Sequence, residues 1–154
     1  MSDKYIKHMA FAVRDAKAAL KHYQDFVGVG QDAELNDYQK SRNRVAIFNV
    51  GDVEYQLCQS LDAGGRFDRW ITERGYEGLH HICYAVPDID ASLSEAQAKG
   101  ATLKECVACG VKGNHPHPEG FVAFLEQETG GIEIELMQVY TPEELEEYRA
   151  VKGI

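Results

Sequence analysis

The chain has 154 residues, with 16 Lys or Arg against 25 Asp or Glu, which gives a formal net charge of −9. Nucleic acids and anionic membranes bind basic surfaces, so this balance argues against both as partners. The first residues hold no apolar signal core, and no run approaches 18 apolar residues. We therefore expect one cytoplasmic domain over residues 1–154, whose four cysteines are reduced.

The predicted elements of the first half are a strand, a helix and three further strands. Their alternating apolar and β-branched residues place the strands at 5–13, 29–36, 43–50 and 52–59. Asp15 is expected to cap the helix, and Gly28 to end it. Phe67, Trp70 and Ile71 lie at helical spacing and predict a short helix between the halves.

The second half predicts the same order of elements. Strands are expected at 79–86, 101–108, 120–126 and 131–139, and a helix between Asp88 and Gly100. Residues 141–151, TPEELEEYRAV, begin with a capping residue and an acidic turn and predict a C-terminal helix. The fold class is therefore α+β, built of two βαβββ modules at 5–59 and 79–139.

The two halves also share individual residues, which indicates an internal duplication. Three positions recur as the same residue type 73 positions later: His8, Val13 and Asp15, against His81, Val86 and Asp88. The segments VEYQLCQ at 53–59 and IEIELMQ at 132–138 match at an offset of 79. The difference between the offsets predicts an insertion in the second half, for which GVKGNHPHPEG at 110–120 is the candidate.

The duplication places four polar side chains in register: His8, Gln56, His81 and Glu135. Singly, a strand histidine or glutamate is more often structural, but the pairing of all four favours a shared cleft. Imidazole, amide and carboxylate groups suit one divalent ion such as Co, Zn, Ni, Mn or Mg. Four protein ligands leave room for water or substrate on a metal that prefers six.

Four stretches closely resemble methylmalonyl-CoA epimerases of the vicinal oxygen chelate superfamily: KHMAFAVRD, VAIFNVGDVEYQL, EGLHHICYAV and GGIEIEL. The resemblance implies a glyoxalase-like fold, in which the modules form a curved mixed sheet around a divalent metal, and a homodimer. It assigns the metal to His8, Gln56, His81 and Glu135. The family's acid/base glutamate has no counterpart in QKSRN at 39–43, where Glu34 or Asp37 of the neighbouring strand are the substitutes.

The implied activity is that of a metal-dependent isomerase or epimerase, which removes a proton alpha to a carbonyl through a metal-stabilised enolate. A methylmalonyl-CoA-like thioester is the favoured substrate, so that the partner is a small anion such as an acyl-CoA. Glu135 acts as the catalytic base only if it leaves the metal. The alternatives are a glyoxalase I-type lactoylglutathione lyase, another lyase or dioxygenase of the superfamily, and a ligand-sequestering resistance protein without activity.

Two further clusters stand outside this scheme. Cys106, Cys109, His115 and His117 form C-x2-C-x5-H-x-H, which offers zinc two thiolates and two imidazoles. Because this segment falls in an expected strand and a short insertion, ordinary thiols and a polar loop are the favoured interpretation. Lys40, Arg42 and Arg44 form a basic cluster that suits a CoA phosphate, although a solvated turn is favoured there too.

Overall fold

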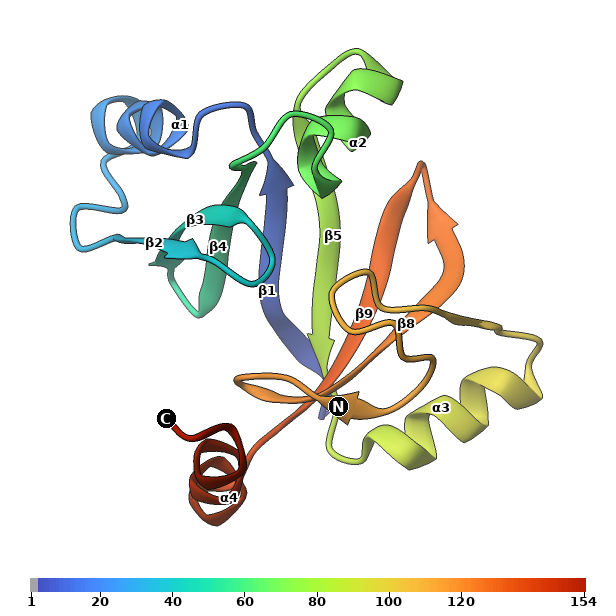
Figure 1. Cartoon of the computed structure of the whole chain (residues 1–154). Helices are drawn as coiled ribbons and strands as arrows, with labels where there is room; N and C mark the ends of the chain where they lie inside the picture. The colour runs from blue at the N-terminus through green and yellow to red at the C-terminus, as the bar shows by residue number, and fades with distance from the viewer. Residues whose placement is uncertain (1–2) are drawn as a thin grey trace. The chain divides into compact units, whose positions relative to one another are not determined.

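The computed structural model describes residues 3–154 and separates the chain into two compact units. The 7–82 unit spans residues 7–82, and the 83–154 unit spans residues 83–154 together with the N-terminal residues up to Ile6. Helices and strands are mixed in both units, so the α+β class is confirmed (Figure 1). Among the described residues, no helix is both long enough and apolar enough to cross a membrane.

The 7–82 unit holds the first predicted module and the connecting helix. Its elements are β1 (Tyr5–Ala12), α1 (Ala16–His22), the π-helical turn η1 (Tyr23–Val27), β2 (Glu34–Tyr38), β3 (Asn43–Val50), β4 (Val53–Ser60), α2 (Arg66–Arg74) and most of β5 (Gly78–Ala85). Strand β3 is antiparallel to both β2 and β4, and β1 runs parallel to β4. These strands therefore lie in the order β2-β3-β4-β1.

Successive strand residues point to opposite faces of this sheet, and each face carries an apolar cluster. A helix packs on each cluster, so both faces are covered. Leu20 of α1 packs with Phe48 and Leu57 on one face. On the opposite face, Phe67 and Ile71 of α2 pack against the small side chains of β1, including Ala10. We call these the α1 face and the α2 face.

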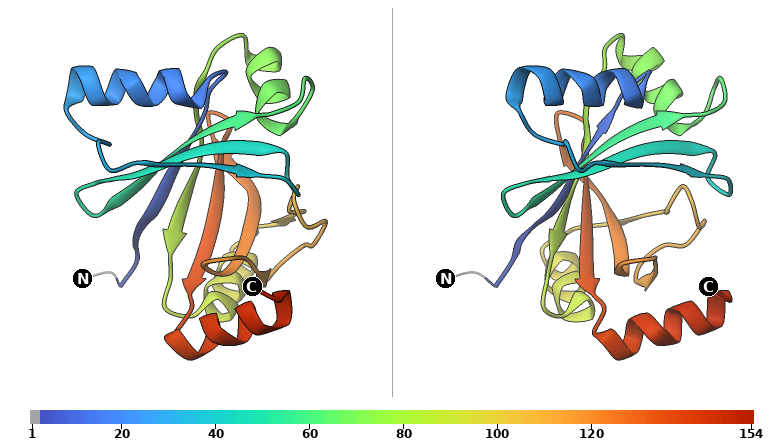
Figure 2. Two further views of the ribbon diagram at one scale, coloured as in Figure 1. Left: turned by 60° about the vertical axis from the view of Figure 1, so that its left-hand side comes forward. Right: turned by 90° about the vertical axis from the view of Figure 1, so that its left-hand side faces the viewer.

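The 83–154 unit holds the rest of the second module. Its elements are α3 (Ile89–Ala98), β6 (Leu103–Lys104), β7 (His115–Pro116), β8 (Gly120–Thr129), β9 (Ile132–Val139) and α4 (Pro142–Lys152). Strands β8 and β9 pair antiparallel and run side by side, in orange, in Figure 2. Helix α3 packs on one face of the pair through Ile89 and Leu93, while Cys83, Cys106, Val122, Phe124 and Met137 cluster on the other.

Equivalent hydrogen bonds in the two units support the duplication. Asp15 accepts a bond of 3.0 Å from the amide of Ala18, and Asp88 accepts one of 3.0 Å from Ala91, so each aspartate caps its helix as predicted. A glutamine on the last strand of each module adds a second acceptor. These bonds are Gln59 with the amide of Ala16 (2.8 Å) and Gln138 with that of Ile89 (3.0 Å).

The largest error of the sequence prediction is the strand expected at 101–108, of which only Leu103–Lys104 is a strand. The amide of Gly110 donates to the carbonyl of Cys106 at 2.7 Å, so the chain turns back where the strand was expected to continue. The predicted insertion is also not a plain loop, because His115–Pro116 pairs with β8. Strand β2 begins at Glu34, not 29, since Gly30 (φ +78°) starts a turn before it.

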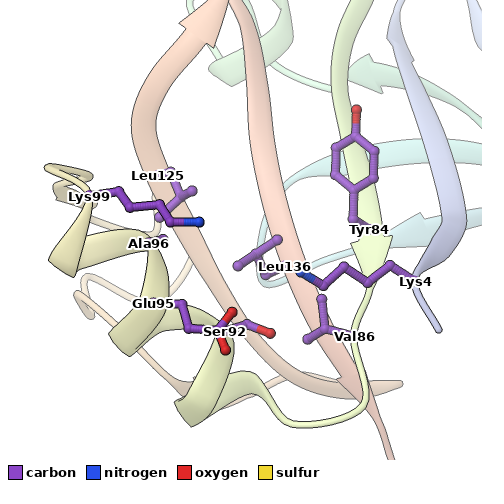
Figure 3. A pocket seen from close by; sticks show the side chains of 9 residues that line it. All are labelled: Lys4, Tyr84, Val86, Ser92, Glu95, Ala96, Lys99, Leu125 and Leu136. Atoms are coloured by element: carbon purple, nitrogen blue, oxygen red, sulfur yellow. The ribbon is translucent and has the colours of Figure 1, made fainter. Parts of the chain in front are cut away.

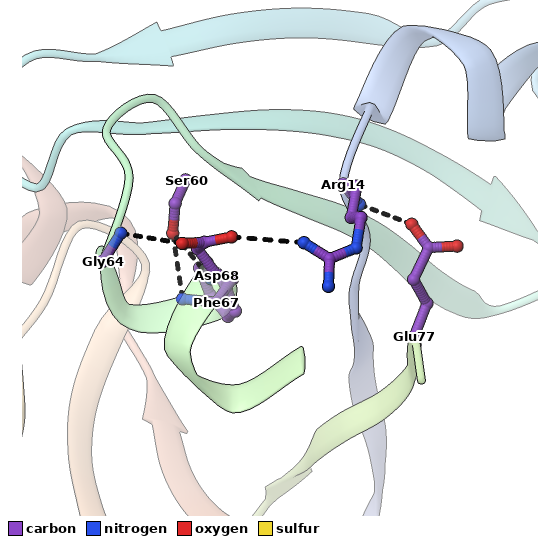
Figure 4. A network of polar contacts seen from close by, with 6 residues as sticks. All are labelled: Arg14, Ser60, Gly64, Phe67, Asp68 and Glu77. Carbon is purple, nitrogen blue, oxygen red and sulfur yellow. Dashed lines mark hydrogen bonds and ion pairs between the residues drawn. The ribbon is translucent and has the colours of Figure 1, made fainter. Parts of the chain in front are cut away.

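The remaining elements agree with expectation. Strand β3 occupies the predicted residues, and Gly28, in the left-handed conformation at φ +79°, ends the helical segment formed by α1 and η1. Thr141 caps α4 in a capping box with Glu144. The connecting helix is present as α2, whose first amides are bound by Ser60: its Oγ accepts from Phe67 at 2.9 Å and from Asp68 at 3.1 Å (Figure 4). Ser60 therefore fixes the start of α2 over the α2 face.

Candidate metal centre

His8 of β1 and His81 of β5 meet inside the 7–82 unit. Both are buried, and their Nε2 atoms lie 3.2 Å apart. Two imidazole nitrogens bound to one ion at about 2.1 Å would be separated by about 3.0 Å in an octahedron and about 3.4 Å in a tetrahedron. The observed spacing falls between these values and fits a pair of ligands on one metal ion.

His80 and its neighbours hold the His81 ring in a state that suits a metal ligand. The Nδ1 atoms of His80 and His81 are 2.7 Å apart, so a hydrogen bond on Nδ1 orients the His81 ring and leaves Nε2 directed at His8. Burial, followed by the nearby charges of His8, Arg66 and His80, holds the pKa of His81 well below its usual value. His81 is therefore neutral at pH 7, which is the form that binds metals.

The two adjacent histidines have different surroundings. The ring of His80 lies against two aromatic side chains of α2, with centroid distances of 5.0 Å to Phe67 and 5.4 Å to Trp70. His81, the histidine that the duplication matches to His8, is the one whose Nε2 lies next to that of His8. Helix α2 thus supports the histidine pair through His80.

Gln56 lies on the same sheet face as His8. It is the cross-strand neighbour of Ala10, and Glu54 is that of His8, so all four side chains project from the α2 face. The Gln56 Nε2 donates to Glu54 at 2.8 Å, which leaves its Oε1 as the atom offered to a metal. Glu54 Oε2 also lies 4.0 Å from His8 Nδ1.

Glu54 is a candidate functional residue that the sequence reasoning missed. Its signal was present in VEYQL, where residues two apart on a strand share a face. A carboxylate that accepts from one predicted ligand and lies beside another is the kind of group that orients metal ligands. We therefore regard Glu54 as a positioning residue for Gln56 and His8.

The register of the strands places Glu34 and Asp37 on opposite faces of the sheet. Glu34 faces Ile47 of β3, which faces Gln56 of β4, so the three side chains form a row on the α2 face. Two strand spacings place Glu34 about 10 Å from Gln56. Asp37 lies three residues further along β2, on the α1 face, where Arg44 binds its carboxylate at 2.7 and 3.0 Å. Only Glu34 shares the face of the predicted ligands.

Glu135 belongs to the 83–154 unit, where it is 3 % exposed on β9. Its cross-strand neighbour is Phe124, so it projects from the face opposite α3. Glu133 shares that face and forms an ion pair with Lys104 of β6. The assignment of Glu135 to the same metal as the histidines stays a prediction.

The cysteines and histidines of the insertion also come together in the 83–154 unit. Cys106, Cys109, His115 and His117 each offer a ligand atom, and these atoms all lie within 4.8 Å of one another.

The positive charge of the basic cluster at 40–44 is largely neutralised. Arg42 binds Asp62 and Arg44 binds Asp37, which favours the solvated turn over a phosphate site.

A pocket of about 320 Å³ lies between α3 and the strands of the 83–154 unit (Figure 3). Leu125 and Leu136 form part of its apolar wall, and the chains of Lys4 and Lys99 border it. Because Leu136 alternates with Glu135 along β9, the pocket opens on the α3 side and Glu135 projects from the other side. It is therefore separate from the predicted metal ligand of this unit.

Comparisons with known proteins identify the family of the chain. Residues 7–121, which include His8, Gln56 and His81, match the model of the glyoxalase/bleomycin resistance protein/dioxygenase superfamily. The human mitochondrial methylmalonyl-CoA epimerase is 27% identical over 135 residues, which cover 86% of this chain and 73% of that protein. It is an isomerase by name, which supports an enzymatic role for the chain.

Solved structures share the fold. The methylmalonyl-CoA epimerase of Mycobacterium tuberculosis matches with a TM-score of 0.69 at 21% identity and covers 88% of each chain. A methylmalonyl-CoA epimerase in complex with methylmalonyl-CoA and NH4+ matches with a TM-score of 0.63 at 20% identity, over 88% of this chain and 94% of that one. The chain belongs to the glyoxalase/bleomycin resistance protein/dioxygenase superfamily, also called the vicinal oxygen chelate superfamily.

Proposed function

We propose that the protein is a divalent-metal-dependent epimerase that acts alpha to the carbonyl of a methylmalonyl-CoA-like thioester. The observation that carries the proposal is the buried pair of His8 and His81, with Nε2 atoms 3.2 Å apart in the 7–82 unit. The epimerases among the relatives supply the choice of substrate. The ligands would be His8, Gln56, His81 and Glu135, and a bound ion would polarise the substrate carbonyl and acidify the neighbouring C–H.

Neighbouring residues orient the side chains of two of the proposed ligands, Gln56 and His81. Glu54 keeps the amide of Gln56 turned so that Oε1 is available, and His80 fixes the ring of His81. The aromatic side chains of α2 pack against His80 and so fix the residue that orients His81. These contacts prepare the two ligands before any substrate binds.

Epimerisation needs one group that takes the α-proton and one that returns a proton to the opposite face of the carbon. In our proposal Glu34 provides one of these carboxylates, because it lies on the α2 face in the row that includes Gln56. Glu135 provides the other if it leaves the metal, as the sequence predicted. One C–H bond breaks and another forms, so the reaction needs no redox partner.

Solvent isotope exchange tests the proposal directly. The purified, metal-loaded protein is incubated with methylmalonyl-CoA in deuterium oxide, and deuterium at the α-carbon is followed by mass spectrometry or NMR. Incorporation during turnover is expected, and its absence would overturn the epimerase. Activity with methylglyoxal plus glutathione, and none with the acyl-CoA, would instead select the lactoylglutathione lyase.

The quaternary state and the location belong to the same proposal. A homodimer is implied by the resemblance to the epimerases, and a cytoplasmic location by the composition of the chain; both stay predictions. Sedimentation or size-exclusion chromatography with light scattering tests the dimer, and a monomer at the concentrations of the assay would contradict it.

A further inference from the structure

We propose that the 83–154 unit binds a second metal ion, a structural zinc, through Cys106, Cys109, His115 and His117. This inference does not depend on the proposed epimerase activity. Three of the distances among the four side chains join Nε2 of His117 to its neighbours: 3.5 Å to Cys106 Sγ, 3.3 Å to Cys109 Sγ and 3.1 Å to His115 Nε2. Each is close to an edge of one tetrahedron.

The expected edges follow from known bond lengths. With Zn–S of about 2.3 Å and Zn–N of about 2.05 Å, a tetrahedron has S–N edges of about 3.6 Å and N–N edges of about 3.4 Å. Hydrogen bonding is a poorer explanation of the same distances. The Nε2 of an imidazole holds either one proton or one lone pair, so it cannot bond well to two sulfurs and a second imidazole together. A cation between the four atoms satisfies all of them.

The backbone presents the four side chains from two short elements. The cysteines are three residues apart in the turn that the Gly110 amide closes on the Cys106 carbonyl at 2.7 Å, and a bridge between Glu105 and Lys112 joins the two arms of that turn. His115 lies in β7 and His117 follows it, where the His117 amide donates to the carbonyl of Gly120 at 2.8 Å; the two imidazole rings lie with centroids 4.8 Å apart. The pairing of His115 with Val122 of β8 holds β7 in place.

The surroundings of His115 resemble those of a zinc-bound histidine. Its Nδ1 lies 2.8 Å from the carbonyl of Gly113, which can only accept, so Nδ1 carries the proton and Nε2 has the free lone pair. His115 is 6 % exposed and Cys106 is 2 % exposed, whereas Cys109 is exposed and gives an ion access to the site. Four protein ligands leave no open coordination position on the ion, as in a structural zinc site.

A zinc ion there would stabilise the segment that has least regular structure in this unit. Regular structure between β6 and β8 is limited to the Glu105–Lys112 bridge and the two residues of β7, and single hydrogen bonds such as that of Asn114 with Asp90 (3.1 Å) join the rest to the unit. Val122, which faces His115, belongs to the same sheet face as Phe124, the cross-strand neighbour of Glu135. The ion would therefore fasten a loop on the face that presents Glu135.

Zinc content and cobalt spectroscopy test the proposal. The full chain is purified with reductant and zinc, passed through gel filtration and measured by inductively coupled plasma mass spectrometry. Cys109→Ser, at an exposed position, and His117→Ala are each expected to lose one equivalent of zinc relative to the unmodified protein. Cys58→Ala, which removes a buried cysteine outside the cluster, is the control for the loss of a thiol and should lose none.

Cobalt distinguishes this site from the predicted His8–His81 site, whose ligands include no thiolate. A thiolate-to-cobalt charge-transfer band is expected in the unmodified protein and in His81→Ala, and is expected to vanish in Cys109→Ser. Equal zinc content in the unmodified protein and Cys109→Ser, or no charge-transfer band in the unmodified protein, would overturn the proposal. A Cys106–Cys109 disulfide that persists under reductant, with no zinc bound, would overturn it as well.

Discussion

The two modules of this chain have kept the same framework and the matched histidines His8 and His81, and they differ in the segments around the candidate sites. In both, an aspartate caps the helix and a glutamine from the last strand binds its first amide, at nearly equal distances. In the 7–82 unit, which holds the first module and the start of the second, rings of α2 pack on His80 next to the histidine pair, and the Glu54 carboxylate lies beside His8. The 83–154 unit replaces a full strand with a turn and a cysteine–histidine cluster. The residues that cap the helices are therefore alike in both modules, whereas the residues around the candidate sites differ.

The strongest test of the equivalence of the two matched histidines compares His8→Ala with His81→Ala. If the two are equivalent ligands, each should lower kcat/KM for α-proton exchange by about 10³-fold or more, because the charge that stabilises the transition state is lost. Metal analysis and isotope exchange measure the effect, with the exposed His22→Ala as control. Retention of metal and turnover in either variant would show that the histidine pair is structural.

A second comparison uses two carboxylates of one strand that face opposite sides. Glu34→Gln is expected to lower the exchange rate by about 10²-fold, the effect of removing a general acid or base. Asp37→Asn, on the α1 face, is expected to leave the rate within about twofold, since it breaks only an exposed ion pair with Arg44. Equal effects of the two substitutions on the rate would remove Glu34 from the mechanism.

Glu54→Gln tests whether a carboxylate positions the ligands of the 7–82 unit. The variant replaces the carboxylate with a neutral amide, which accepts a weaker hydrogen bond from Gln56 Nε2 and orients it less firmly, so metal affinity is expected to fall about 10-fold. Titration with a competing chelator measures the affinity, and Glu73→Gln, exposed on α2, is the control. An unchanged metal affinity would leave Glu54 without a positioning role.

The stability of the metal-free protein should depend on pH through His81. Because its pKa is lowered in the folded state, the unfolded chain binds more protons below its ordinary pKa near 6.5, and acid favours unfolding. Stability should therefore fall as the pH drops from 6.5 toward the folded pKa, by at most about 1.4 kcal/mol per pH unit for this one group. Urea unfolding at several pH values checks this, and His81→Gln should show a smaller slope.

The smallest expected effect compares the two helix caps. Asp15→Ala and Asp88→Ala should each destabilise the protein by about 1 kcal/mol, since each leaves a helix amide without its acceptor. In a chain of this size the midpoint of thermal unfolding would fall by about 2–4 °C. Calorimetry measures the destabilisation caused by each substitution. A difference between the two values would show that the modules contribute unequally to cooperative unfolding.

Much of the framework followed from the sequence because its signals are local. Asp15, Gly28 and Thr141 begin or end helices through bonds to residues a few positions away, and the alternation of VAIFNV is visible within one strand. The repeat itself singled out His8 and His81, whose proximity depends on residues 73 apart. A duplicated sequence thus carries long-range information that a single module would lack.

Tertiary structure decided what depends on register and on turns. The choice of Glu34 over Asp37 needed the pairing of three strands, and the role of Glu54 needed its place across from His8. The turn that closes on Cys106 ended a strand that alternation alone predicted to continue. The sequence favoured ordinary thiols over zinc ligands for C-x2-C-x5-H-x-H, because spacing alone does not set the distances among four side chains, which the folded backbone does.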